Sequence, residues 1–372
     1  MPVYLDHAAT TPLRPEAVAA MLPFLTEHFG NPSGSHAFAR RAKQAIEEAR
    51  DVLAAALGCE PREVVFTGGG TEADNLAVLG VHRARGGTVV CSAVEHHAVL
   101  HAVESACGRT VRVGADGVVD LDALAAAIDE SVTLVSVMLA NNEVGVVQPL
   151  GDVVDVVRRR APRAAVHTDA VHAFPWLDVA TLAAGCDLVS VSAHKFGGPK
   201  GVGALVLRDG TQLAPLLVGG GQERELRSGT HNVAGIVAMA AAAAATVETR
   251  APVVNRAGPL RDRLADTVLS AVDGAVETGD RSTKVAGNCH LRFRGVESES
   301  LLVLLDEAGI CASAGSACAS GAIEPSHVLV AMGIPRDEAS GAVRLTLGPS
   351  TTEDDVEVAS KAVVDAVARL RG

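Results

Sequence analysis

Short apolar, β-branched runs alternate with helical segments over most of this chain. The runs that fit buried strands lie at residues 63–66, 88–91, 110–113, 132–139, 164–167 and 187–191. The helices predicted between them include residues 72–82, 121–128 and 150–159. Strands that alternate with helices in this way form a mainly parallel sheet with helices packed on it. The sequence therefore predicts an α/β fold.

The two ends of the chain depart from this alternation. Residues 15–29 and 33–57 predict two amphipathic helices ahead of the first strand. An alanine-rich helix is predicted at residues 232–249, followed by charged helices and two strands at 288–293 and 343–347. A chain of 372 residues fits about two domains. We expect a large α/β domain at residues 14–250 and a small α+β domain made of residues 1–13 and 251–372.

Composition excludes several classes of partner. The net charge is −12 and no Lys/Arg-rich run is present, so nucleic acid is not an expected partner. The longest apolar stretch, residues 233–247, is shorter than the ~20 residues that cross a membrane, and the first residues do not resemble a signal peptide. Seven dispersed cysteines without a CxxC pair predict reduced thiols and a cytoplasmic protein.

Lys195 lies where a predicted buried strand breaks into a glycine-rich turn. The stretch reads DLVSVSAHKFGGPKGVGALVL and begins at Asp187. A lysine with little access to water loses its proton readily and can form a Schiff base with an aldehyde. A lone lysine in such a place would more often extend to the surface, so the catalytic interpretation depends on the neighbouring motifs.

Other predicted strands also end in polar residues of distinct types. The first is followed by Gly68, Gly69, Gly70 and Thr71 at the start of a helix, where backbone N–H groups and the helix dipole favour a phosphate. The run matches neither a Walker A loop nor GxGxxG, so a simple helix N-cap is the alternative. The run that ends at Thr168 is followed by Asp169, an acid that needs a cationic partner when buried.

Histidine and asparagine follow two further strands. His96 could stack on a flat ring, and Asn142 offers a neutral hydrogen-bond donor. His97 and His101 are spaced i, i+4 and could be half of a metal site, but no second ligand pair is visible, so we do not predict one. A phosphate-binding glycine turn, an acid, a stacking residue and a Schiff-base lysine together predict a site for pyridoxal 5′-phosphate (PLP).

Two features near the C-terminus complete the predicted site. Residues 311–320 are all Ala, Ser, Gly or Cys, so we expect a mobile loop with Cys318 exposed in its middle. Arg344 lies in an alternating strand, where it could clamp a carboxylate or form a structural ion pair. The sequence alone does not separate these two roles.

Motifs along nearly the whole chain resemble the cysteine desulfurases, which belong to the class V aminotransferase group of fold-type I PLP enzymes. The matching stretches are YLDHAATTP, FGNPSGSH, FTGGGTEADNLAV, VEHHAVL, NNEVGVVQP, HTDAVHAF, SAHKFGGPKGVGALV, GGGQERELRSGTHN, SAGSACASGAIEPSHVL and VRLTLG. The SAGSACAS form is similar to the subgroup with a long mobile cysteine loop, which serves iron–sulfur assembly and tRNA thiolation.

The resemblance implies a role for each matching residue. Lys195 would hold PLP as a Schiff base, His96 would stack on its ring and assist proton transfer, and Cys318 would accept sulfur from L-cysteine as a persulfide. The other implied cofactor contacts are Asp169 at the ring nitrogen, Asn142 and His172 near the ring oxygen, Gly70, Thr71, Ser192 and His194 at the phosphate, and Thr230 at the phosphate of a partner subunit. Arg344 and Asn31 would bind the substrate carboxylate. A homodimer and a sulfur-acceptor or scaffold protein are the implied partners.

His172 departs from the family pattern, which has glutamine at this position. Because histidine titrates near neutral pH, we expect a shifted pH optimum. Two alternatives to cysteine desulfuration follow: a selenocysteine lyase or sulfinate-acting relative, and a catalytically impaired sulfur-relay docking protein. A further fallback, a generic aminotransferase, leaves the Cys318 loop unexplained.

Overall fold

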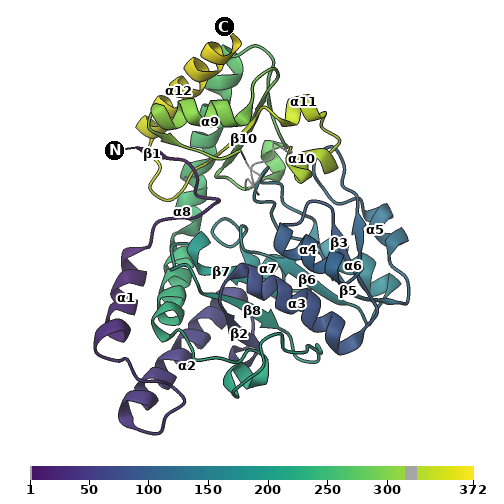
Figure 1. Ribbon diagram of the computed structural model, residues 1–372, viewed down its shortest axis with the longest axis vertical. Coiled ribbons are helices and arrows are strands. Elements are labelled where there is room, and N and C mark those ends of the chain that lie inside the picture. The colour runs from purple at the N-terminus through teal and green to yellow at the C-terminus, as the bar shows by residue number, and fades with distance from the viewer. Residues whose placement is uncertain (1, 315–324) are drawn as a thin grey trace.

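The computed structural model describes residues 2–314 and 325–372 (Figure 1). Its strands are β1 (Val3–Tyr4), β2 (Val64–Thr67), β3 (Thr88–Ser92), β4 (Arg109–Val111), β5 (Val132–Ser136), β6 (Ala165–Asp169), β7 (Leu188–Ser192), β8 (Gly203–Leu207), β9 (Ala275–Glu277), β10 (Asn288–Phe293), β11 (Ile310–Cys311) and β12 (Ala342–Thr346). Its helices are α1 (Pro15–Thr26), α2 (Ala37–Leu57), α3 (Gly70–Arg85), α4 (His97–Ser105), α5 (Leu121–Ala127), α6 (Leu150–Arg160), α7 (Val179–Leu182), α8 (Val233–Ala271), α9 (Ser298–Glu307), α10 (His327–Ala331), α11 (Arg336–Ala339) and α12 (Glu353–Arg371).

The central sheet has seven strands in the order β2-β8-β7-β6-β5-β3-β4. Strand β8 is antiparallel to both of its neighbours, and every other pairing is parallel. The carboxyl ends of β2, β3, β5, β6 and β7 therefore meet at one edge of the sheet. The mainly parallel sheet predicted from the β-α-β alternation is confirmed.

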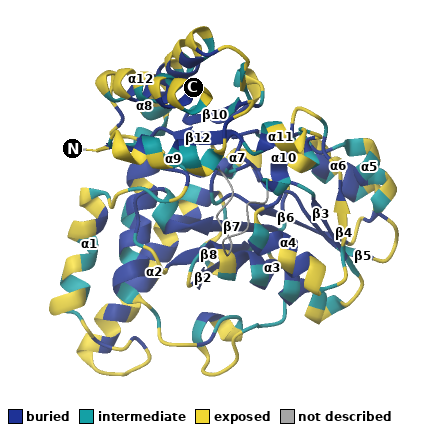
Figure 2. Cartoon of the chain, turned by 45° about the horizontal axis from the view of Figure 1, so that its top comes forward, coloured by how far each residue is buried: buried dark blue, intermediate teal, exposed yellow. Residues whose placement is uncertain are grey.

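Both faces of the central sheet are covered, so its strands are almost entirely buried except for the edge strand β4, where only Val111 is buried (Figure 2). Alternate side chains point to opposite faces: Phe66 and Val206 pack with α2, α6 and the first part of α8, whereas Val65 and Leu205 pack with α3 and α4. A strand buried on both faces is a continuous apolar run, and this accounts for the short β-branched runs in the sequence.

A second group of elements surrounds a smaller antiparallel sheet of order β12-β10-β9. Its core combines this sheet with α9, α12 and the second part of α8, and includes Phe293, Leu301 and Val363. The N-terminal arm joins this group, because β1 pairs in parallel with β11 and Asp6 bridges to Thr346.

Helix α8 connects the two groups without a break, and here the sequence prediction was wrong. The helix expected to end at residue 249 continues to Ala271, through Pro252 and Pro259. Both prolines are exposed on the helix, where water can satisfy the carbonyl that each proline leaves free. The boundary expected between residues 250 and 251 therefore falls inside a helix. By length and composition α8 could cross a membrane, but 56% of its most apolar window is buried in the protein.

Most other element boundaries differ from the predicted ones by one to four residues. Helix α2 begins at Ala37 instead of residue 33, with the imidazole of His36 accepting the Ala39 N–H as an N-cap. Strand β5 ends at Ser136, three residues early, but Val137 and Leu139 continue to donate to backbone carbonyls of β6.

Candidate active site

A cavity of about 470 Å³ lies beyond the carboxyl ends of the central strands. Loops after β2, β3, β5, β6 and β7 contribute to it, together with the N-terminal arm and β12. The predicted site residues that line it are Gly70, Thr71, His96, Asn142, Asp169, His172, Ser192, His194, Lys195 and Arg344. This is the position in which open α/β sheets bind ligands.

The glycine turn after β2 leads directly into α3, a helix of 16 residues. Its N-cap, Gly69, has φ 144° and supplies no side-chain cap, so the amides of the first turn face the cavity without one. A Cβ on Gly70 would lie 2.9 Å from Val171 and 3.3 Å from Ser192. A helix N-terminus with glycine at the point of closest approach can hold a phosphate, and the hydroxyls of Thr71 and Ser192 border the same space.

Lys195 closes a 3₁₀ turn, Ala193–Lys195, that follows β7. Its Nζ donates to the carbonyl oxygens of Ala8 at 2.5 Å and Ala9 at 2.9 Å, both in the N-terminal arm. Burial, and then the positive charge of Arg344, lower the Lys195 pKa to about 8. A substantial part of this amine is therefore neutral near physiological pH, as a Schiff-base nucleophile requires.

Asp169 is the last residue of β6 and is buried. One carboxylate oxygen accepts the N–H of Val171 at 2.8 Å. Burial raises the pKa of Asp169 to about 6, opposed by this hydrogen bond and by the charge of Lys195. An acid in this position can stabilise a cation placed in the cavity.

His96 and His172 border the cavity as neutral rings. Burial, and then the charge of Lys195, lower the pKa of His96 to about 4 and that of His172 to about 3. The Nε2 of His172 has no hydrogen-bond partner among the described residues. We expected His172 to titrate near neutral pH and to shift the pH optimum; the buried position overturns that reasoning, because the ring stays neutral over the physiological range.

Arg344 combines both roles that its sequence context left open. It donates to Asp6 Oδ1 at 2.8 Å and to the backbone oxygen of Asn142 at 2.9 Å. It also lines the cavity, and its Nε has no partner within the described part of the chain. The guanidinium is thus oriented by an ion pair and keeps a donor free.

Two predicted residues do not line the cavity. Asn31 is exposed in the turn between α1 and α2, where its side chain accepts the Ser33 N–H at 3.0 Å, and it does not line the cavity. Thr230 is exposed in the segment before α8 and is likewise absent from the cavity wall. Cys318 lies outside the described residues.

Sequence reasoning missed several residues that line the cavity. They include Asp74, Glu143, Ser313 and His327. Asp74 had a visible signal, since it is an acid on the apolar face of a predicted helix. The ring of His327 contacts that of His97, with centroids 4.4 Å apart and the ring planes tilted by 45°. Among the described residues, no group of three or more His, Cys, Asp or Glu side chains could hold a metal ion.

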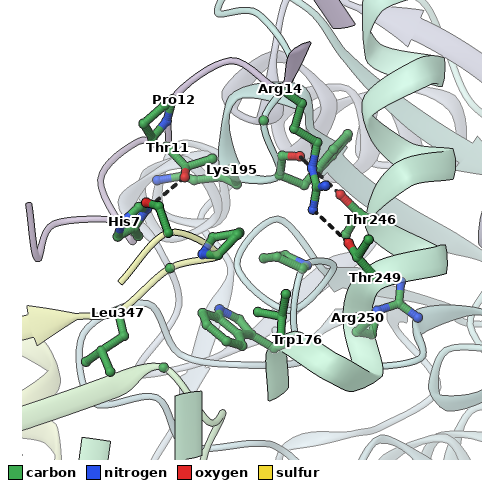
Figure 3. A pocket seen from close by; sticks show the side chains of 18 of the residues that line it. His7, Thr11, Pro12, Arg14, Trp176, Lys195, Thr246, Thr249, Arg250 and Leu347 are labelled. Carbon is green, nitrogen blue, oxygen red and sulfur yellow. Dashed lines mark hydrogen bonds between the residues drawn. The ribbon is translucent and has the colours of Figure 1, made fainter. Parts of the chain in front are cut away.

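A second cavity of about 300 Å³ adjoins the first and shares Ala8, His172 and Lys195 with it. Figure 3 shows Lys195 beside Thr11 and Pro12 of the N-terminal arm, with Trp176 across the space from them. Lys195 therefore forms part of the wall between the two cavities.

The donor set of the first cavity fits PLP. The N-terminus of α3 suits a phosphate, the acid Asp169 suits a pyridinium nitrogen, and the unpartnered Nε2 of His172 suits a ring oxygen. Lys195 supplies the amine that an aldehyde needs. The fold and this set of side chains define a fold-type I PLP-dependent enzyme.

Comparison with known proteins identifies the family. The model for "Aminotransferase class-V" matches residues 3–358. The chain is 45% identical to an "IscS-like cysteine desulfurase" of Mycobacterium tuberculosis, over 99% of this chain and 97% of that protein. It is 42% identical to "Cysteine desulfurase IscS" of Dictyoglomus turgidum, over 99% and 95%. A solved "NIFS-LIKE PROTEIN" aligns with a TM-score of 0.93 and 34% identity, covering 99% of this chain and all of that one. The chain belongs to the class-V aminotransferases and, within them, to the cysteine desulfurase family.

Proposed function

We propose that this protein is a PLP-dependent cysteine desulfurase that converts L-cysteine to L-alanine and passes the sulfur to Cys318. The observation that carries the proposal is the meeting of Lys195, Asp169 and the N-terminus of α3 around one cavity. Relatives named cysteine desulfurase, aligned over nearly the whole chain, support the choice of reaction.

PLP bound in this cavity supplies an electron sink for the α-carbon of an amino acid. Asp169 would favour a proton on the ring nitrogen by offering a negative charge, and His96 would contact the ring without adding a charge. The first turn of α3, with Thr71 and Ser192, would hold the phosphate. His194, whose Nδ1 lies 3.2 Å from the Thr10 hydroxyl, adds a further neutral donor.

Arg344 and Lys195 divide substrate binding and proton transfer between them. Arg344 binds the substrate carboxylate through its free Nε while Asp6 holds the guanidinium in place. Lys195 would accept the α-proton of the substrate as a neutral amine, which its lowered pKa makes available. The Ala8 and Ala9 carbonyls receive the ammonium group that results.

The sulfur step balances without an external oxidant. The thiolate of Cys318 attacks the substrate sulfur, an S–S bond forms as the Cβ–S bond breaks, and the Cβ carbon takes a proton. The products are a Cys318 persulfide and L-alanine. We propose that the persulfide then passes to an acceptor protein for iron–sulfur assembly or tRNA thiolation.

We further propose a homodimer in which Thr230 completes the site of the partner. Thr230 and Asn31 are both exposed and do not line the cavity of their own chain. Large apolar side chains are exposed on the same two segments: Phe29 is 71% and Val218 is 80% exposed. Exposed apolar groups of this size favour burial in an interface.

The test is to incubate the purified chain with PLP and L-cysteine and to measure alanine, sulfide and the mass of the peptide that contains Cys318. We expect alanine formation and a mass increase of one sulfur atom on that peptide. Cys318→Ala should bind PLP normally and lose the cysteine reaction. Alanine release by Cys318→Ala at the wild-type rate would instead indicate a lyase that does not use this thiol, and a chain that binds no PLP would refute the proposal.

A further inference from the structure

Asp74 is a buried acid that the proposed mechanism does not use. It lies one turn into α3, is 1% exposed, and lines the wall of the candidate active site. Its neighbours on the helix, Ala73 and Ala77, are fully buried. A charge in such a position is costly unless a cation meets it.

The groups that face Asp74 provide no cation. On β6 these are Asp169, whose carboxyl group is hydrogen-bonded to that of Asp74, and His167, whose Nε2 lies 3.7 Å from Asp74 Oδ1. On β7, the Ser190 hydroxyl is a further neutral group near Asp74. Glu95, which precedes α4, contributes a further acid.

His167 is a neutral neighbour. Its two ring nitrogens are shared between Ser136 Oγ at 2.8 Å and Ser190 Oγ at 2.9 Å. Burial lowers the His167 pKa to about 3. The Oδ1 atom of Asp74 has no hydrogen-bond partner in the described chain, which a charged oxygen would require. Two carboxyl groups in contact need a proton between them, and Asp74 is the more deeply buried of the two.

We propose that Asp74 is a positioning residue that stays protonated and donates its O–H to Asp169, so that Asp169 remains a carboxylate opposite the ring nitrogen of PLP. This inference rests on the proposed function, because it assumes PLP in the cavity with its nitrogen at Asp169. It gives Asp74 a role in the site, which the proposed mechanism leaves without one.

The hydrogen bond donated by Asp74 favours one of two positions for the proton between Asp169 and the PLP ring, namely the ring nitrogen. Burial raises the pKa of Asp169, and the value remains about 6 although the Val171 N–H, the charge of Lys195 and Asp74 all lower it, so this acid competes with a pyridine nitrogen for a proton. The hydrogen bond from Asp74 lowers the Asp169 pKa. A neutral donor behind the carboxylate therefore favours the ion pair between Asp169 and a protonated ring.

The test compares Asp74→Leu, which removes the donor, with Asp74→Asn, whose amide preserves it. Each full-length variant is loaded with PLP labelled with ¹⁵N at the ring nitrogen, and the ¹⁵N chemical shift is followed against pH. For wild type and Asp74→Asn we expect the shift of a protonated ring nitrogen. For Asp74→Leu we expect the shift to move toward the unprotonated value and the dissociation constant of PLP to rise about tenfold to a hundredfold, the range of a lost hydrogen bond to a charged group.

Glu95→Gln is the matched control. Glu95 is also fully buried, but its Oε1 accepts the Met138 N–H at 2.7 Å. We expect this variant to keep the wild-type ¹⁵N shift. An unchanged shift in Asp74→Leu with PLP bound would overturn the proposal. So would an unprotonated ring in Asp74→Asn, which would mean that Asp74 acts as a charged acceptor.

If Asp74→Leu does not fold, Asp74→Asn still tests the proposal, because an unprotonated ring nitrogen in that variant would contradict it. Failure of the proposed function is separate: wild-type protein would then not bind labelled PLP at all, or would bind it and form no alanine from L-cysteine. An enzyme that fails only in the Asp74 comparison leaves the desulfurase proposal intact.

Discussion

The lowered pKa of Lys195 predicts an unusual pH dependence for the covalent capture of PLP by the apoprotein. Only the neutral amine attacks an aldehyde. With a pKa of about 8, about one tenth of Lys195 is neutral at pH 7 and about nine tenths at pH 9. The capture rate should rise about tenfold over this interval and then level off. An ordinary lysine would give a rise of about a hundredfold that continues to pH 10.

Stopped-flow absorbance of apoprotein mixed with PLP measures this rate. A short lysine peptide under the same conditions corrects for the ionisation of PLP itself, and Lys195→Ala shows that the signal belongs to this residue. Arg344→Gln provides a second perturbation. Because the charge of Arg344 lowers the Lys195 pKa, this variant should move the midpoint of the rate profile to higher pH.

Two results would refute this account of Lys195. The first is a corrected rate that still increases steeply between pH 9 and 10. The second is an unshifted midpoint in Arg344→Gln, which would mean that burial alone sets the pKa.

Two further predictions concern the frame around the site. A Cβ at Gly203 would lie 2.7 Å from two backbone atoms of neighbouring segments, so Gly203→Ala should lower the free energy of unfolding by about 1–3 kcal/mol and weaken PLP binding. At Gly151 a Cβ would have no atom within 4 Å, so Gly151→Ala should change neither property. Equal unfolding free energies for the two variants would contradict this prediction. Glu223 is buried and bonds both terminal nitrogens of Arg50 at 2.8 and 2.9 Å, so Glu223→Gln should cost about 3–5 kcal/mol in a denaturant titration. Asp209→Asn, which breaks an exposed pair, should leave the unfolding midpoint almost unchanged, and similar losses in the two variants would refute the distinction.

The acid dependence of Glu223 has a defined direction. Hydrogen bonds from Arg50 and His231 outweigh burial and lower the Glu223 pKa from 4.5 to about 2. The stability that this carboxylate contributes is therefore complete above about pH 4.5 and is lost as the pH falls toward 2. The Glu223→Gln variant should lack this component of acid unfolding.

Much of the site could be predicted because its residues follow strands. Lys195 and Asp169 come at or just beyond the carboxyl ends of β7 and β6, and the parallel pairing of strands brings such ends to one edge of the sheet. The glycine turn before α3 is equally local, since a helix N-terminus needs only its own backbone to attract an anion.

Contacts between distant segments could not be predicted in the same way. The carbonyls that hold Lys195 belong to Ala8 and Ala9, more than 180 residues earlier in the chain. Arg344 was ambiguous for the same reason, since Asp6 becomes its partner only when β1 and β12 are assembled.

The sequence by itself determined the order of strands and helices, the parallel sheet and the chemistry at the strand ends, because hydrophobic period and turn residues act over a few positions. Only the tertiary structure decided the ionisation of that chemistry. Burial makes His172 a neutral ring and, together with the charge of Arg344, lowers the pKa of Lys195 to about 8. The fold also brings Asp74 and Asp169 to the same cavity. Desolvation depends on everything that surrounds a group, and in this chain the surroundings come from elements hundreds of residues apart.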